Sequence, residues 1–214
     1  MSATPPPVLK VRHLGFAYPG QAPLFVDWSA DIDAGLTLLQ GDMSCGKTTL
    51  LRLLAGELPS TGERHLQGRR LGDDPPADRR DLCWFDPRDP LFDALTAQAL
   101  MQHLRLRHPA LDVDAWQRHA DGLALTPHLA KPLFALSTGS RRKAALAIAL
   151  SAGCPLTLLD EPAAGLDGPS ARYLAKALLD MVRGRPRAVV LVCSFGLDDL
   201  PWDGTITLSP SAAG

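Results

Sequence analysis

The hydrophobic and polar residues near the N-terminus alternate in the manner of β-strands. Residues 8–18 alternate imperfectly, and residues 25–33 alternate more regularly. In the second segment the apolar side chains are predicted to share one face: Val26, Trp28, Ala30 and Ile32. Such alternation is typical of an antiparallel strand that has one face in solvent. Pro19 and Gly20 lie between the two segments and predict the turn that joins them.

The pattern then changes to short apolar runs and helical periodicity. Residues 36–40 form an apolar run that predicts a buried strand, and residues 49–55 predict a short helix that Gly56 ends. Residues 63–71 are a further strand candidate. We expect the charged, proline-containing residues 72–81 to form an exposed loop.

Residues 82–85 predict another buried strand, and beyond them the periodicity is helical. Thr96 and Asp112 are each placed to cap a helix whose apolar side chains repeat on one face. We therefore expect residues 87–135 to form an inserted helical subdomain. Such an insertion can serve as a docking surface for a partner or simply pack against the core, and the sequence leaves both uses open.

The C-terminal third alternates between helices and apolar strands. Helices are predicted at residues 141–152 and 168–182, and strands at residues 156–161, 188–193 and 205–208. This alternation indicates a mostly parallel sheet wrapped by helices. The predicted fold class is α/β, with an antiparallel β subdomain at the N-terminal end and the helical subdomain as an insertion.

The most specific motif, G-x-x-x-x-G-K-T, joins the strand at residues 36–40 to the helix that follows it. Glycines let backbone N–H groups close around a polyphosphate, and the helix N-terminus adds a partial positive charge. Lys47 would reach the β- and γ-phosphates, and the hydroxyl group of Thr48 would ligate Mg²⁺. The motif predicts a P-loop NTPase whose nucleotide contacts come from Gly41, Asp42, Met43, Ser44, Cys45, Gly46, Lys47, Thr48 and Thr49.

Two carboxylates follow the apolar strand that begins at residue 156. Asp160 and Glu161 lie at its carboxyl end, where open parallel sheets collect their chemistry. Asp160 would meet the Mg²⁺ held by Thr48, and Glu161 could polarise a water molecule. We therefore predict Asp160 as a second metal ligand and Glu161 as the catalytic residue.

Composition narrows the class of protein. A chain of 214 residues with a net charge of −1 fits one domain and argues against a nucleic-acid binder that works by broad electrostatics. The first residues do not resemble a signal peptide, and no apolar run is long enough to span a bilayer, so we expect a cytoplasmic protein.

The cysteines and histidines suggest no metal site. The cysteines form no C-x-x-C pair and are expected to be reduced core residues: Cys45, Cys83, Cys154 and Cys193. Oxidation of Cys45 could block nucleotide binding, or the residue is simply a tolerated small one. The six histidines show no ligand spacing, and we expect all of them on the solvated surface.

The order of these parts resembles the nucleotide-binding domain of the ATP-binding cassette (ABC) family over residues 8–208. Between the phosphate loop and the acidic strand, residues 136–140 read L-S-T-G-S and resemble the family signature L-S-G-G-Q. The resemblance implies that Tyr18 stacks on adenine, although the residues alone equally allow a strand-end aromatic. It also implies that residues 165–167 cross a dimer interface.

The resemblance divides the chain into a core, residues 8–86 and 136–214, and the helical subdomain. Three departures from the family pattern matter. In the signature, Thr138 replaces the first glycine and Ser140 replaces the glutamine, whereas Ser137 and Gly139 remain and are expected to contact the γ-phosphate of the other subunit's ATP. Residues 86–88, where the family has its glutamine loop, contain no glutamine. Ser194 stands where the family has a switch histidine, and serine cannot act as a charged γ-phosphate partner.

The resemblance implies an ABC transporter ATP-binding subunit. Two copies, or one copy and another ABC ATPase, would sandwich two ATP molecules with Mg²⁺ and power a separately encoded permease at the inner face of the membrane. Catalysis would rest on Glu161 and Lys47, with Ser194 at the switch position, and would be slow in isolation. The alternative is an ATP-gated module, slow or non-hydrolytic, that regulates a partner complex. The missing histidine and glutamine favour this module, whereas the retained Glu161 favours the ATPase.

Overall fold

The structure is a computed structural model that describes residues 5–84, 92–194, 196–197 and 199–209. Its described strands form two sheets. The antiparallel sheet has the order β2-β1-β4-β5, with bounds Pro23–Ile32, Leu9–Ala17, Thr61–Leu66 and Arg69–Arg70. The parallel sheet has the order β6-β7-β8-β3-β9, with bounds Leu82–Trp84, Leu156–Asp160, Ala188–Val192, Gly35–Gly41 and Gly204–Leu208. This mixed α/β architecture confirms the predicted fold class.

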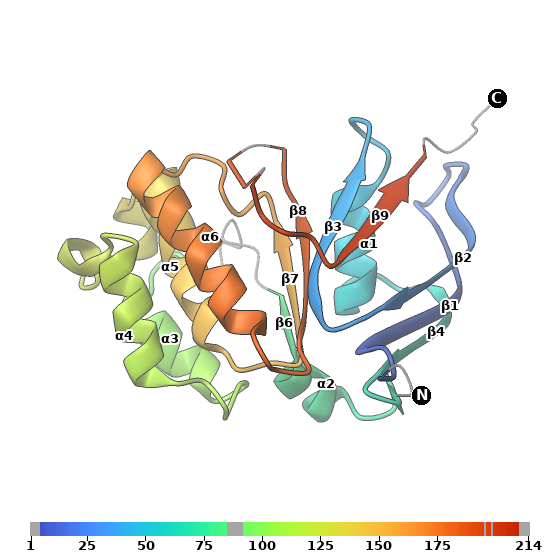
Figure 1. Ribbon diagram of the computed structural model, residues 1–214, viewed down its shortest axis with the longest axis horizontal. Coiled ribbons are helices and arrows are strands. Elements are labelled where there is room, and N and C mark those ends of the chain that lie inside the picture. The colour runs from blue at the N-terminus through green and yellow to red at the C-terminus, as the bar shows by residue number, and fades with distance from the viewer. Residues whose placement is uncertain (1–4, 85–91, 195, 198, 210–214) are drawn as a thin grey trace.

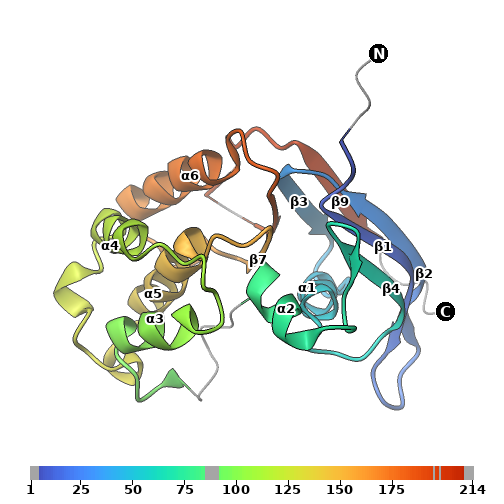
Figure 2. The same cartoon turned by 90° about the horizontal axis from the view of Figure 1, so that it is seen from below.

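Helices cover both faces of the parallel sheet. Figures 1 and 2 show α5 and α6 on one side, and α1 with the antiparallel strands on the other. The described α-helices are α1 (Lys47–Ala55), α2 (Pro75–Asp81), α3 (Ala97–Arg105), α4 (Val113–Gly122), α5 (Thr138–Ser151) and α6 (Gly168–Val182). Short 3₁₀ helices lie at Thr126–His128 and Leu133–Ala135. None of the described helices combines the length and apolar character that a membrane crossing requires.

The core explains why β8 is apolar at every position. Val189 and Leu191 pack into the cluster that includes α3 to α6, whereas Val190 and Val192 pack into the cluster around α1 and the antiparallel sheet. Because both faces are covered, the strand reads as a continuous apolar run instead of an alternating one. The residues of α3 and α4 share a core with α5 and α6. The division of the chain at residues 87 and 135 stays a prediction.

The predicted inward face of β2 is wrong at Val26, whose exposed fraction is 75%. The neighbouring Phe25 is buried instead. The cause is a bulge: Leu14 pairs with Trp28 and Phe16 with Phe25, so β2 carries an extra residue, and Asp27 adopts a φ of 53°. A bulge shifts the alternation by one position, so Phe25 takes the place predicted for Val26.

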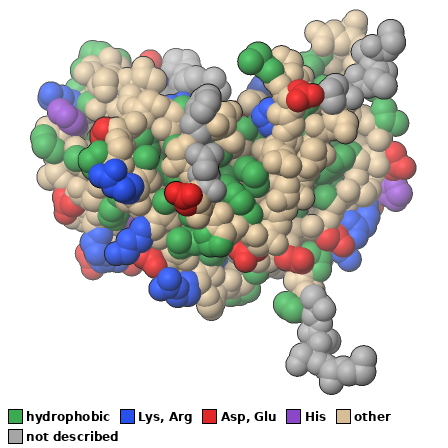
Figure 3. Space-filling view, turned by 45° about the horizontal axis from the view of Figure 1, so that its top comes forward, with side chains coloured by type: hydrophobic (Ala, Val, Ile, Leu, Met, Phe, Trp, Pro, Cys, Tyr) green, Lys and Arg blue, Asp and Glu red, His purple; other side chains and the backbone are tan. Residues whose placement is uncertain are grey.

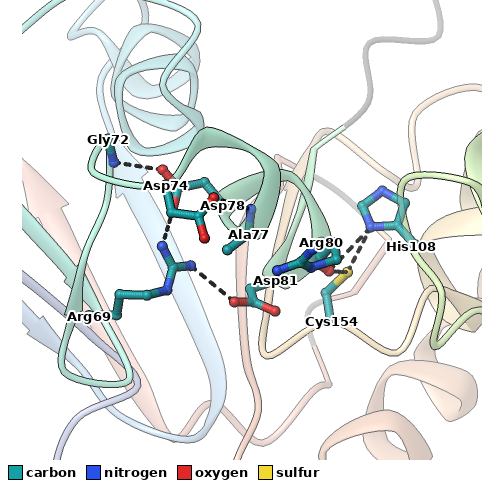
Figure 4. Close-up of polar contacts among 9 residues, drawn as sticks. All are labelled: Arg69, Gly72, Asp74, Ala77, Asp78, Arg80, Asp81, His108 and Cys154. Carbon is teal, nitrogen blue, oxygen red and sulfur yellow. Dashed lines mark hydrogen bonds and ion pairs between the residues drawn. The ribbon is translucent and has the colours of Figure 1, made fainter.

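The expectation of a loop at residues 72–81 is also wrong, because α2 forms there (Figure 4). Asp74 caps the helix by accepting a 3.2 Å hydrogen bond from the N–H of Ala77, and two prolines occupy the first turn, where no N–H partner is needed. Arg69 pairs with Asp78 and, at 3.0 Å, with Asp81. These ion pairs hold the helix against the β4–β5 hairpin.

Candidate active site

The phosphate loop connects β3 directly to α1. Its first glycine cannot be replaced, because a Cβ atom on Gly41 would lie 2.4 Å from the carbonyl oxygen of Leu208 and 2.7 Å from Sγ of Cys45. The ammonium group of Lys47 donates hydrogen bonds of 2.7 Å and 2.8 Å to the carbonyl oxygens of Gly41 and Asp42. These contacts hold the positive charge over the loop, where a phosphate chain would lie.

The loop residues differ in exposure. Cys45 is buried at 5% exposure, as expected for a small core residue, whereas Met43 is 93% exposed. Ser44 adopts a φ of 63°, and Gly46 follows at 96° as the N-cap of α1. Positive φ angles at Ser44 and Gly46, on either side of Cys45, turn the backbone of this short loop sharply, which lets several N–H groups point toward one side.

A cavity of about 450 Å³ lies beside the loop. It is lined by Tyr18 and residues 21–24 on one side, and by Ser44 and residues 46–49 on the other. The Tyr18 hydroxyl lies 3.1 Å from Oγ1 of Thr49, and the ring packs edge-on against Phe16 with centroids 4.8 Å apart. The volume is in the range of small-molecule pockets. Tyr18 is thus fixed next to the loop, beside the space that a nucleotide base would need.

The two predicted metal ligands meet. The hydroxyl of Thr48 donates a 2.7 Å hydrogen bond to Oδ2 of Asp160, although the residues are 112 positions apart. The contact arises because α1 packs against β7, which ends at Asp160. A hydroxyl and a carboxylate are both hard oxygen donors and suit Mg²⁺, which is commonly held by one or two protein oxygens plus substrate phosphates and water. The residues present therefore fit this ion.

Glu161 and Ser194 also lie together. Ser194 donates its backbone N–H to Oε2 of Glu161 at 3.0 Å and its hydroxyl to Oε1 at 2.5 Å. The backbone of Glu161 has a φ of 47°, in the left-handed region that non-glycine residues seldom adopt. Its N–H is held by the carbonyl oxygen of Val192 at 2.9 Å. Strained residues of this kind cluster at functional sites.

The signature residues form the start of α5, which begins at Thr138, three residues earlier than predicted. The reason is a cap: the side chain of Ser137 accepts a 3.1 Å hydrogen bond from the N–H of Ser140. Gly139 lies against Gly165, and a Cβ atom on Gly139 would be 2.7 Å from the carbonyl oxygen of Gly165. The signature and the predicted interface loop therefore touch within one chain.

The side chains that join the signature helix α5 to residues 164–167 were not predicted from the sequence. Arg142 donates to the carbonyl oxygen of Ala164, and the buried Lys143 pairs with Asp167 at 2.6 Å. Lys143, together with the N–H and hydroxyl of Ser170, holds the pKa of Asp167 well below its usual range. The sequence shows only a basic cluster at residues 141–143, and its partner lies on another element.

Not all predicted site residues come together in one chain. Neither Ser137 nor Gly139 lines the cavity beside the phosphate loop. Residues 86–88, the position of the family's glutamine loop, lie outside the described residues. Figure 3 shows the surface on the side of the carboxyl ends of the strands. On this surface, Lys and Arg side chains gather over the helices.

The expectation that every histidine lies on the solvated surface is wrong for His108, which is 6% exposed. Its Nδ1 atom lies 3.2 Å from Sγ of Cys154 and 3.4 Å from the carbonyl oxygen of Arg80 (Figure 4). Burial lowers the pKa of this imidazole. All four cysteines are free thiols, and Cys193 is less buried than the other three.

Comparison with protein families and with individual relatives gives consistent matches. The family model described as ABC transporter matches residues 27–164. The cytochrome c biogenesis ATP-binding export protein CcmA of Pseudomonas savastanoi pv. phaseolicola is 36% identical over 165 residues, which cover 76% of each chain. The molybdenum import ATP-binding protein ModC of Albidiferax ferrireducens is 33% identical over 173 residues, or 78% of this chain and 47% of that protein.

Larger relatives match only in part. ATP-binding cassette sub-family A member 7 of Rattus norvegicus is 33% identical over 195 residues, which are 88% of this chain but 9% of that protein. Among solved structures, an ATP-binding subunit of an ABC transporter superposes with a TM-score of 0.82 over 94% of this chain and 85% of its own, at 21% identity. That likeness concerns the fold alone.

Proposed function

The chain belongs to the ABC transporter family as an ATP-binding component, and from this premise we propose that it binds Mg-ATP at the phosphate loop and hydrolyses it. The observation that carries the proposal is the 2.7 Å hydrogen bond between Thr48 and Asp160. It places the phosphate loop against the carboxyl end of the acidic strand, so one bound triphosphate would meet both. Glu161 follows Asp160 directly in the chain and supplies a second carboxylate after the end of this strand.

Each residue has a role that its contacts support. The cavity beside Tyr18 would accept the base, and Lys47 would exchange its carbonyl contacts for phosphate oxygens. Thr48 and Asp160 would hold Mg²⁺, which, when bound, neutralises charge on the phosphates. Glu161 would orient the attacking water through a carboxylate that Ser194 holds in place. Phosphoryl transfer depends mostly on such positioning and charge stabilisation, so these groups would supply much of the catalysis.

We further propose a head-to-tail dimer. Ser137 and Gly139 do not line the cavity of their own chain, so a second subunit could bring its signature to the open side of the ATP. The partner copy can be the same chain or another ABC ATPase. Relatives named as an export and an import protein both fit a chain that works with a permease, at the inner face of the membrane. The direction of transport stays open.

Steady-state phosphate release tests the proposal. Wild-type protein should release phosphate from Mg-ATP slowly when isolated and faster with its permease. Glu161→Gln should abolish most of this release while Mg-ATP still binds and holds a dimer on a sizing column. Glu63→Gln, which removes an exposed carboxylate of β4, is the matched control and should leave the rate unchanged. Wild-type turnover by Glu161→Gln would refute the catalytic assignment.

One observation favours a second candidate, an ATP-gated module that hydrolyses slowly or not at all. Both oxygens of Glu161 already accept hydrogen bonds from Ser194, and a carboxylate engaged in this way is less available to a water molecule. In that case ATP binding alone would regulate assembly with a partner. Phosphate release that stays at the Glu161→Gln level even with the permease present would support this module over the ATPase.

A further inference from the structure

A groove lies at the amino ends of β7 and β8, on the opposite edge of the sheet from the phosphate loop. Figure 2 looks onto this edge, with α4, α5 and α6 side by side. The groove has a volume of about 530 Å³ and is lined by these three helices and by Arg185 and Arg187 of the turn before β8. The phosphate loop follows the carboxyl end of β3, which runs parallel to β8. The groove is therefore distinct from the proposed nucleotide site.

Positive charge exceeds negative charge in this groove, although the whole chain has a net charge of −1. The cationic lining residues are Arg118, Lys176, Arg185 and Arg187, and the acidic ones are Asp112 and Asp180. Both carboxylates are engaged: Asp112 caps α4 and lies 3.9 Å from Arg118, and Asp180 lies 3.5 Å from Arg183, which is outside the lining. Within the described residues, the remaining three cations form no ion pair within 4.0 Å.

Arg187 is the most informative of these cations. Its side chain is partly buried, and burial followed by the nearby charge of Arg185 lowers the pKa of its guanidinium group. Arginine that loses hydration in a folded protein is normally paired with an acid. Here Arg187 lines an open groove together with Arg185, and neither forms an ion pair within 4.0 Å among the described residues. An anion bound in the groove beside them would offset the lost hydration of Arg187.

The rest of the lining restricts the kind of anion. Ala177, Met181 and Leu150 supply apolar surface, and the hydroxyl of Tyr173 is fixed 3.0 Å from Nδ1 of His119. A volume near 500 Å³ accepts a small molecule with an apolar body. Guanidinium groups bind phosphate oxygens in a bidentate manner. We propose that this groove binds a phosphate group, with Arg185 and Arg187 as its contacts and the apolar surface beneath the remainder of the ligand.

The phosphate can belong to a free small molecule or to a lipid headgroup, and the experiment separates the two. Inorganic pyrophosphate is titrated calorimetrically into Lys47→Ala protein, in which the phosphate loop lacks its ammonium group. The titration is repeated with Lys47→Ala protein that also carries Arg185→Gln and Arg187→Gln, which removes both proposed phosphate contacts of the groove. Arg105→Gln in the Lys47→Ala background is the matched control, since it removes an exposed arginine of α3 that lies outside the lining. Pelleting with phosphatidylcholine vesicles, with and without phosphatidic acid, is the second arm.

We expect the groove double substitution to weaken pyrophosphate binding at least about tenfold, which corresponds to about 1.4 kcal/mol, because two charge-assisted contacts are lost, whereas Arg105→Gln leaves it unchanged. Vesicle binding that needs phosphatidic acid and falls with the same two substitutions, without pyrophosphate binding, assigns the phosphate to a lipid. Equal binding by the groove variant and the control in both arms would overturn the proposal. Unaltered circular dichroism and melting temperature, measured without probe, establish that the variants are folded.

Discussion

Ser194 binds both oxygens of the Glu161 carboxylate, one through its hydroxyl at 2.5 Å and the other through its N–H at 3.0 Å. The sequence predicted Ser194 as a weak substitute for a histidine that contacts the γ-phosphate. The geometry supports a different role, in which Ser194 positions the residue that would orient water. The backbone contact does not depend on the side chain and would survive substitution by alanine or histidine, so the hydroxyl contact can be tested separately.

Ser194→Ala should therefore change the rate of ATP hydrolysis without abolishing ATP binding. Loss of a hydrogen bond to a charged group is worth about 1.5–3 kcal/mol, which corresponds to roughly a ten- to hundredfold slower rate if the hydroxyl positions Glu161 for catalysis. Single-turnover phosphate release measures this directly. If the hydroxyl instead holds Glu161 away from water, the same variant would be faster than wild type, and the positioning role would be wrong.

Ser194→His provides the reciprocal test at the same position. An imidazole could contact a γ-phosphate as a charged partner, which serine cannot do, and we expect hydrolysis to rise by up to about a hundredfold if the ring fits. Phosphate release is again the measurement, with the ATP-induced shift in melting temperature as the control for binding. No gain in rate with binding intact would locate the limit in the altered signature or at residues 86–88.

Mg-ATP should raise the melting temperature of the isolated protein. Binding at a hundred times the dissociation constant adds about 2.7 kcal/mol to the free energy of unfolding, or roughly 5–10 °C for a chain of this size. Lys47→Ala should lose most of the shift, because the ammonium group that lies over the loop is gone. Lys131→Ala, at an exposed position between the two 3₁₀ helices, should keep it. The absence of any wild-type shift at millimolar Mg-ATP would exclude the nucleotide site.

Protonation of His108 should destabilise the fold at mildly acidic pH. Because burial lowers the pKa in the folded state, the unfolded chain takes up the proton first as the pH falls below the ordinary value near 6.5. The contribution of the neutral ring is therefore complete above that pH and declines below it. Urea unfolding at a series of pH values should show a shallower decline for His108→Gln than for wild type.

The exposed His103 of α3 offers the control for that measurement, and His103→Gln should follow the wild-type pH dependence. His119 also has a pKa lowered by burial, but it is present in every variant and cancels in the difference. Parallel curves for wild type and His108→Gln would mean that the ring does not titrate in this window.

The sequence predicted the parallel sheet correctly because β7 and β8 are covered on both faces: every residue of β8 is apolar, and β7 is apolar except at Thr157 and at Asp160, where the strand ends. It also predicted the caps of α3 and α4, since Thr96 and Asp112 act on the N–H groups three positions later. Local signals of this kind need no knowledge of the rest of the fold. The meeting of Thr48 with Asp160 was predictable as well, because parallel strands present their carboxyl ends at one edge.

Most of the incorrect predictions concern residues whose structure depends on contacts with other segments of the chain. The bulge at Asp27 depends on how β2 pairs with β1, and α2 is stabilised by Arg69, which lies before it on another element. His108 is buried against Cys154, 46 residues away, so no local pattern distinguishes it from an exposed histidine. Proline within residues 72–81 predicts a loop on its own, whereas at the first turn of a helix it is favourable.

The close approach of Gly139 to the carbonyl oxygen of Gly165 has a consequence for how interface mutants are interpreted. Any side chain at Gly139 would displace residues of its own subunit before a second subunit arrives. A variant that fails to dimerise would then report an altered protomer as well as a blocked interface. Mixing such a variant with wild-type chains separates these two effects. In a heterodimer of the proposed kind, the ATP that contacts the wild-type signature would be hydrolysed normally. Only hydrolysis of the ATP that contacts the altered signature would be lost.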